Sequence, residues 1–244
     1  MRALIIIILI SVASFSINAQ QTLDIAAPAE TGGNYGTINF VDMSSLGHKQ
    51  MENISYADVL GSPFWVDDWN SAMFFLSGNR KAKVQKAKLD LYANEVRFID
   101  KSGVELALEN TTVLIIIFFK GVDTTKVLSV FESLPDSLSE TKFSYYQVLN
   151  SGKFKLLILK KSFVKEGEYN PMLGTKDHSF YSKINYAIAN NEEIFPIRSF
   201  NQANILPLVS ASADAIQWLK NKDNKLKNAT EVVAFLNYYN AQKK

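Results

Sequence analysis

The sequence predicts a mainly β protein of the α+β class, with an antiparallel β-meander, in one sheet or more, covered by two C-terminal helices. Three observations predict this fold. Apolar residues fall on every second position in residues 61–119, which is the period of a strand with one buried face. A second alternating group occupies residues 145–197. Residues 212–240 carry instead the i, i+3, i+4 spacing of helices.

The first residues have the pattern of a secretory signal peptide. Arg2 precedes an apolar run over residues 3–12, and small or polar residues lead to Ala19. The run is shorter than the roughly 20 residues of a comfortable membrane span. We therefore expect residues 1–19 to be removed and the protein to be periplasmic or secreted, without a transmembrane span. A retained membrane anchor is the alternative.

Composition excludes several classes of function. The chain of 244 residues has 26 Lys plus Arg against 24 Asp plus Glu, so no basic surplus remains to bind nucleic acid. It contains no cysteine, which excludes disulfides, thiolate metal sites and a lipid-acceptor cysteine. The sequence therefore predicts an exported protein that is not a lipoprotein.

Glycines mark the segment before the meander. Gly32, Gly33 and Gly36 are turn and linker residues, so we expect residues 20–55 to be a flexible N-terminal segment. A short strand over residues 37–41 and an irregular helical turn within residues 43–54 are compatible with the pattern. Residues 56–244 are then predicted as a single antiparallel β domain with C-terminal helices.

The first alternating group predicts a run of strands joined by short turns. We expect the strands over residues 71–77, 83–92, 95–100, 103–109 and 112–119. Ala93-Asn94 is predicted as a tight two-residue turn, because Asn tolerates the left-handed backbone that such a turn needs. Residues 113–119 are apolar without alternation, so we expect a central strand covered on both faces, with the C-terminal helices over it.

The second group is less regular. Residues 122–139 are compatible with a strand or a short helix that ends at Pro135. A hairpin is predicted from residues 145–149 to 154–159, followed by a polar excursion over residues 165–177. Alternation then resumes over residues 180–189.

Two helices are predicted at the end. Ser212 is a capping residue before the first, and Asn228 with Glu231 has the spacing of a capping box before the second. The second helix carries one apolar stripe, formed by Val232, Phe235, Leu236 and Tyr239. This stripe predicts that the helix is docked on the sheet.

No constellation in the sequence predicts catalysis, a cofactor or a metal site. His48 and His178 lie far apart in polar segments, outside any ligand pattern. Asp67 and Asp68 are flanked by Trp65 and Trp69, a combination found in sugar-binding sites. Neighbouring side chains point to opposite faces of an extended chain, so the two carboxylates cannot converge as a catalytic pair.

These observations predict a protein that is not an enzyme. The candidate binding residues are the four of the tryptophan and aspartate cluster: Trp65, Asp67, Asp68 and Trp69. Exposed tyrosines are a further candidate surface, since tyrosines come as pairs among Tyr145, Tyr146, Tyr181, Tyr238 and Tyr239. Where such a pair lies in a strand, we expect one member to face outward.

Several short motifs resemble a family. Residues 61–64, Gly-Ser-Pro-Phe, precede Asp67-Asp68-Trp69, and residues 89–98 form a hairpin motif that contains Leu91-Tyr92-Ala93-Asn94. In these motifs, and in the last helix, the chain resembles uncharacterised exported proteins of Bacteroidetes-type bacteria. Their hairpin has an L-x-Y-N-like pattern, from which this chain departs by its alanine. The resemblance implies an envelope location and brings no catalytic residue.

Three functions remain open from the sequence. The first is a non-enzymatic envelope protein that presents a β-sheet surface to another protein or a surface polymer. The second is a periplasmic carrier of lipid or another apolar ligand between the sheet and the C-terminal helices. The third is a carbohydrate-binding or carbohydrate-active protein.

Overall fold

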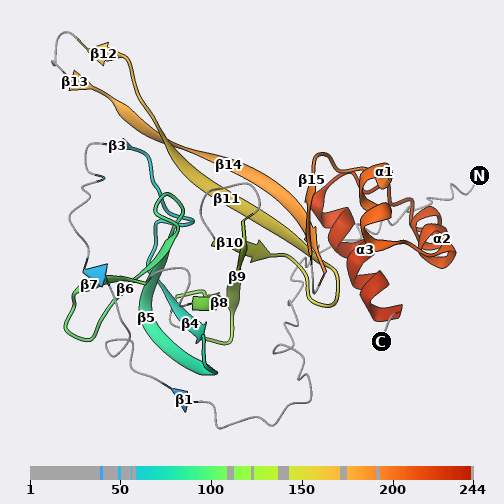
Figure 1. Ribbon diagram of the computed structural model, residues 1–244, viewed down its shortest axis with the longest axis horizontal. Helices are drawn as coiled ribbons and strands as arrows, with labels where there is room; N and C mark the ends of the chain where they lie inside the picture. Colours follow the sequence, from blue (N-terminus) through green and yellow to red (C-terminus); the bar gives the residue numbers. More distant parts are fainter. Residues whose placement is uncertain are drawn as a thin grey trace, which may run out of the picture.

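The computed structural model describes residues 39–40, 49–50, 56, 59–108, 113–121, 124–136, 143–170, 175–190 and 193–242. The predicted mainly β class is confirmed, because strands make up 48% of the structure against 19% for helix, and the α-helices lie near the C-terminus (Figure 1). The predicted signal peptide and His48 lie outside the described residues, as does most of the predicted flexible segment.

Up to residue 197, the described regular elements are strands, apart from the helical residue Tyr56. The first eight are β1 (Asn39–Phe40), β2 (Lys49–Gln50), β3 (Val59–Leu60), β4 (Asn70–Leu76), β5 (Arg80–Asp90), β6 (Glu95–Ile99), β7 (Glu105–Leu108) and β8 (Val113–Phe119). The others are β9 (Val127–Pro135), β10 (Phe143–Val148), β11 (Lys155–Lys165), β12 (Tyr169–Asn170), β13 (Thr175–Lys176), β14 (His178–Ala189) and β15 (Ile194–Ile197).

The two strand groups form one sheet of 13 strands. Eleven of them follow the order β15-β14-β11-β10-β9-β8-β4-β5-β6-β7-β2, and β1 and β3 lie off this path. Neighbours along this path are antiparallel, as the predicted meander requires. The prediction is wrong for two short strands, because β1 pairs with β5 and β3 with β14 in parallel. β12 and β13 form a separate hairpin inside the predicted polar excursion.

Residues 122–139, for which a strand and a short helix were both open, contain the strand β9. One local prediction is corrected. The two-residue turn at Ala93-Asn94 is wrong, because residues 91–94 form a longer turn between β5 and β6. Of residues 43–54 the structure describes only the two residues of β2, which pair with β7, so the expected helical turn lies outside the described residues.

One hydrophobic core lies inside the curled part of the sheet from β4 to β10. Phe74, Phe98 and Ile116 come from three different strands and are fully buried there. Two contacts of the β5–β6 turn join this part of the sheet to β11 and to the start of β10. The N–H of Ser162 on β11 donates to the Leu91 carbonyl at 3.1 Å, and the side chain of Asn94 bonds the start of β10.

The second core lies between the helices and the far end of the sheet. The helical segments are α1 (Gln202–Ile205), a 3₁₀ turn at Pro207–Val209, α2 (Ala213–Asn221) and α3 (Ala229–Gln242), so there are three α-helices rather than the predicted two. Phe154, which directly precedes β11, Leu156 of β11 and Ile188 of β14 pack against α3 residues such as Phe235. Burying each large side chain contributes about 1.5–3 kcal/mol.

The helices therefore cover β11 and β14, and the prediction that they cover residues 113–119 is wrong. β8 is a central strand, as predicted, but it lies between β4 and β9. Ile116 and Phe118 fill the curled core, whereas Leu114 is 46% exposed. The predicted docking of α3 by its apolar stripe is confirmed, with Phe235 and Tyr239 buried.

Both predicted helix caps are confirmed. The Ser212 hydroxyl accepts the N–H of Ala215, and the Asn228 side chain accepts the N–H of Glu231 at 2.9 Å. No helix among the described residues has the length and apolar character needed to cross a membrane.

Candidate functional site

The four predicted binding residues lie in a segment that pairs with the end of β5, where Phe64 bridges Asp90 and the Trp65 N–H donates to the Leu89 carbonyl at 2.9 Å. We call Tyr56 and residues 59–69 the strap. Trp65 is half-buried, and its ring lies 5.7 Å from the ring of Phe118 and 5.0 Å from that of Phe131, measured between centroids. It packs against the curled core and leaves little of its ring for a sugar.

The other three do not converge either. Asp67 and Asp68 are exposed, and the Ser62 hydroxyl donates to the Asp67 carboxylate. Trp69 is half-buried, with the ammonium of Lys88 4.7 Å from its ring centroid. The structure therefore does not bring the four residues together as one site: Trp65 packs on the core, Trp69 contacts Lys88, and the two aspartates lie at the surface.

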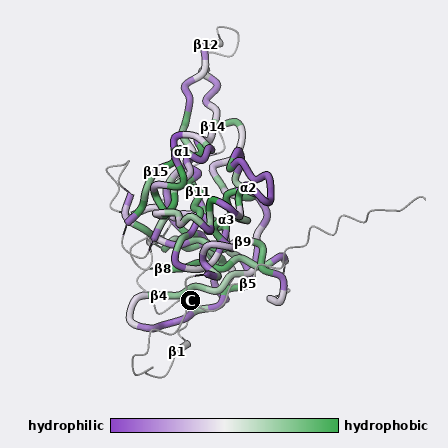
Figure 2. Tube along the Cα trace, turned by 90° about the vertical axis from the view of Figure 1, so that its right-hand side faces the viewer, coloured by the Kyte–Doolittle hydropathy of each residue, from purple (hydrophilic) through white to green (hydrophobic). Residues whose placement is uncertain are grey.

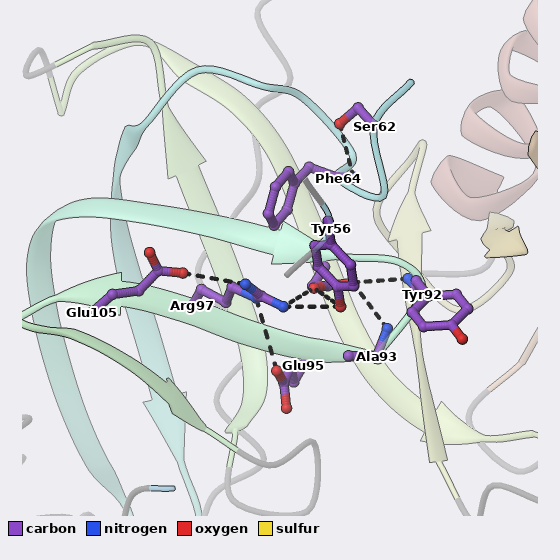
Figure 3. Close-up of polar contacts among 9 residues, drawn as sticks. Tyr56, Ser62, Phe64, Tyr92, Ala93, Glu95, Arg97 and Glu105 are labelled. Atoms are coloured by element: carbon purple, nitrogen blue, oxygen red, sulfur yellow. Dashed lines mark hydrogen bonds and ion pairs between the residues drawn. The ribbon is translucent and has the colours of Figure 1, made fainter. Parts of the chain in front are cut away.

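A buried ionic cluster that the sequence analysis did not predict lies beneath the strap (Figure 3). Its centre is Asp90, at the end of β5, whose side chain is completely buried. One carboxylate oxygen accepts the N–H groups of Tyr92 and Ala93, both at 2.9 Å. The other accepts the Tyr56 hydroxyl at 2.9 Å and lies 2.6 Å from a guanidinium nitrogen of Arg97.

Arg97 faces three carboxylates of different exposure. Besides Asp90, it lies 3.3 Å from Glu105, which is 38% exposed, and its Nε lies 3.8 Å from Glu95. The same guanidinium nitrogen that contacts Asp90 donates to the Tyr56 oxygen at 2.9 Å. Tyr56 therefore donates to a carboxylate and accepts from a cation. Burial, and then the negative charge of Asp90, raise the pKa of Tyr56 well above its ordinary value.

Aromatic rings cover the ionic cluster and connect it to the far hairpin. The ring of Tyr56 lies 6.4 Å from that of Phe64 and 5.3 Å from that of Phe180 on β14, between centroids. Tyr92 also contacts Phe180, at 5.6 Å. Edge-on contacts of this kind contribute about 0.5–1.5 kcal/mol each beyond their buried area. The cluster thus joins the strap, the β5–β6 turn and β14.

This geometry stabilises the fold and occupies the carboxylate of Asp90. Both oxygens of Asp90 are occupied by two donors each, so the carboxylate has no room to act as a base or a metal ligand. Within the part of the chain that the structure describes, no group of three or more His, Asp or Glu side chains could hold a metal ion. His178 is half-buried at the start of β14.

The exposed candidate surface is the outer part of the β11–β14 hairpin. We call residues 160–165 of β11 and 179–185 of β14 the outer arm. It leaves the body of the molecule and leads to the hydrophilic tip at β12 and β13 (Figure 2). Residues 181–185 are all exposed, including 41% of Tyr181 and 53% of Ile184.

The tyrosine prediction is confirmed at only one of its strand positions. Tyr145 and Tyr146 are both buried, so the expectation that one of this pair faces outward is wrong. Burial raises the pKa of Tyr146 to about 12, with Asp136 adding to the shift. Tyr181 does face outward and stacks on Phe163 of β11, with ring centroids 5.5 Å apart.

The outer arm carries positive charge. The ammonium of Lys183 lies 5.2 Å from the Phe163 ring centroid and 5.9 Å from that of Tyr181. Lys161, directly opposite on β11, is instead neutralised by the buried Asp136. Among the described residues, Lys183 has no carboxylate partner, so its charge is available to a binding partner.

Comparison with known proteins adds no match: no family model, no curated protein and no solved structure matches this chain. The resemblance to exported proteins of Bacteroidetes-type bacteria therefore stays a prediction.

Proposed function

We propose that this protein is an exported, non-enzymatic binding protein that presents a β-sheet surface, the outer arm, to another protein or to a polymer of the cell envelope. The observation that carries the proposal is the exposure of residues 181–185 with their apolar and cationic side chains. Exposed tyrosine and isoleucine beside an unpaired cation are features of partner surfaces. The basic, apolar start of the chain supports export.

The space that a lipid carrier would use is occupied by the chain itself. Phe154, Leu156 and Ile188 meet the helices directly, in a cluster whose central members are fully buried. No described side chain in that cluster favours a carrier over a binding protein. The carbohydrate hypothesis likewise gains no support from Trp65, since its ring packs on the core.

A site-specific cross-link tests the proposal. A photoreactive amino acid replaces Tyr181 in one variant and Ile216 of α2, which is 38% exposed, in the control variant. In the cells that make the protein, we expect a partner to be captured from position 181 and not from 216. Equal capture from both positions contradicts the proposal. So does robust turnover on a hydrolase panel that Asp67→Asn abolishes.

A further inference from the structure

β14 has an edge that other strands cover only at its two ends. On one side β11 pairs with it continuously over Ser179–Ala189. On the other side β3 pairs with His178 and Ser179, and β15 pairs with residues 186–189. Gly61, which follows β3, still lies against Phe180, since a Cβ there would be 3.6 Å from the Phe180 carbonyl. No described strand pairs on that side with residues 181–185.

We call residues 181–185 the β14 gap. At about 3.3 Å per residue it is roughly 17 Å long, the length of one ordinary strand. Backbone N–H and C=O groups of alternate residues face an edge of this kind and seek hydrogen bonds. β3 and β15 limit the gap at its two ends, so an added strand would have a defined length and position.

A second, similar gap on β5 shows what a protected edge looks like. β1 pairs with β5 at Arg80 and Lys81, and β6 pairs with it from Ala87 onward. Between them, the exposed side chains are those of Lys83, Gln85 and Lys86, and the register with β4 shifts there. Lysines and a bulge are the usual protection of an edge strand against further pairing.

The β14 gap has less of this protection. It carries one exposed lysine, Lys183, but its register with β11 is regular throughout, without a bulge, and it also exposes Tyr181 and Ile184. The described acidic residues of the hairpin, Glu166, Glu168 and Asp177, lie beyond the arm toward its tip. The gap itself is therefore apolar and cationic.

We propose that the β14 gap binds an extended, acidic peptide segment of a partner protein as an added strand. A carboxylate of the partner lies beside Lys183, and an apolar side chain lies beside Ile184 on the opposite face. This inference rests on the proposed function and specifies its partner. A second copy of the chain fits less well. The antiparallel pairing that fills the whole gap puts Lys183 next to the same residue of the other copy, and like charges in that position repel.

The test uses labelled peptides with the central sequence Thr-Val-Glu-Val-Thr and fluorescence anisotropy on the full chain. A matched peptide has Lys in place of Glu, and a third has N-methyl groups along one backbone edge. We expect the Glu peptide to bind at least about tenfold more tightly than either of the others, because charge complementarity and backbone hydrogen bonds are both needed.

Variants of the protein place the binding site. Lys183→Glu is expected to reverse the preference between the Glu and Lys peptides, whereas Lys86→Glu in the β5 gap leaves it unchanged. Equal binding of the Glu and Lys peptides, or unaffected binding of the N-methylated peptide, overturns the proposal. A partner captured at position 181 without any peptide binding keeps the proposed function and removes strand addition. If an anionic polysaccharide binds at position 181 and the peptides do not, the proposed function also stands and strand addition is removed.

Discussion

The turns at the two ends of β6 use the same local chemistry in opposite environments. Asp90 precedes the first turn and accepts the N–H groups of Tyr92 and Ala93. Asp100 precedes the second and accepts the N–H groups of Ser102 and Val104, at 2.9 and 2.8 Å. Asp90 is buried beneath the strap and paired with Arg97, whereas Asp100 lies at the surface with its turn in solvent.

The left-handed residues of the two turns differ in the same way. Asn94, with φ of 56°, sends its side chain across to the Phe143 carbonyl at 2.8 Å. Gly103, with φ of 88°, has no atom near the place where its side chain would be. The first turn therefore holds distant parts of the sheet together, and the second only reverses the chain. We therefore expect the contribution of each aspartate to the free energy of unfolding to depend on its burial and on its charged partners.

The largest effect is expected at Asp90. Asp90→Asn keeps an acceptor for the two backbone N–H groups but leaves Arg97 buried without its closest counter-charge. Breaking a buried ion pair in this way costs about 3–5 kcal/mol, so we expect a large drop in the free energy of unfolding, measured with denaturant. The matched control is Glu105→Gln, which removes a 38% exposed carboxylate from the same arginine and should cost about 0–1 kcal/mol.

Equal losses in Asp90→Asn and Glu105→Gln would contradict this comparison. They would mean that Arg97 distributes its charge over both acids and that burial does not decide their contributions.

A smaller effect is expected at Asn94. Asn94→Gly keeps the left-handed backbone and removes the bond to the start of β10. The lost hydrogen bond and the added freedom of glycine together predict a loss of about 1–2 kcal/mol in unfolding free energy. Asn94→Asp should lose a similar amount, because a carboxylate cannot donate to the Phe143 carbonyl. An unchanged stability in both variants would show that this contact does not hold the curl.

Local periodicity predicted the strands around the first turn but not its ionic cluster. Alternation through Leu89, Val96 and Phe98 placed β5 and β6 correctly, because each strand buries one face. Asp90 and Arg97 lie on the other face, which the alternation predicts to be exposed to solvent. They are buried by Tyr56, a residue 34 positions earlier in the chain than Asp90. An aspartate followed by a left-handed Asn is a turn signal, but its burial depends on tertiary contacts.

The same limit explains the other failures. Residues 180–189 alternate and were predicted to be a strand, but alternation does not reveal that neighbouring strands cover only the ends of β14. The stripe of α3 predicted a docked helix without naming its partner. Residues 113–119 were predicted as its partner because they are the most apolar run, yet the curled sheet already buries one face of β8. Phe154, Leu156 and Ile188 provided the free apolar face instead.

The smallest effect, at Asp100, is a dependence on pH. The Ser102 side chain, followed by the Val104 N–H, holds the pKa of Asp100 below its ordinary value of 3.8. A carboxylate whose pKa is lowered by folding stabilises the protein above its unfolded pKa, and this contribution is lost as the pH falls through the folded pKa. Asp100→Asn keeps the acceptor and removes the charge. We therefore expect a small decrease in thermal midpoint at neutral pH that disappears in acid.

Ser102→Ala separates the hydroxyl from the rest of the turn. Its loss should move the pKa of Asp100 back toward the ordinary value, which an NMR titration of the carboxyl measures directly. The surface position of Asp100 lets solvent screen its charge, so the shift should also shrink at high salt. If the midpoint difference between wild type and Asp100→Asn instead stayed constant into acid, the ionised carboxylate would add nothing beyond its acceptor oxygen. The two turns of β6 would then differ by the Arg97 pair and the Asn94 contact alone.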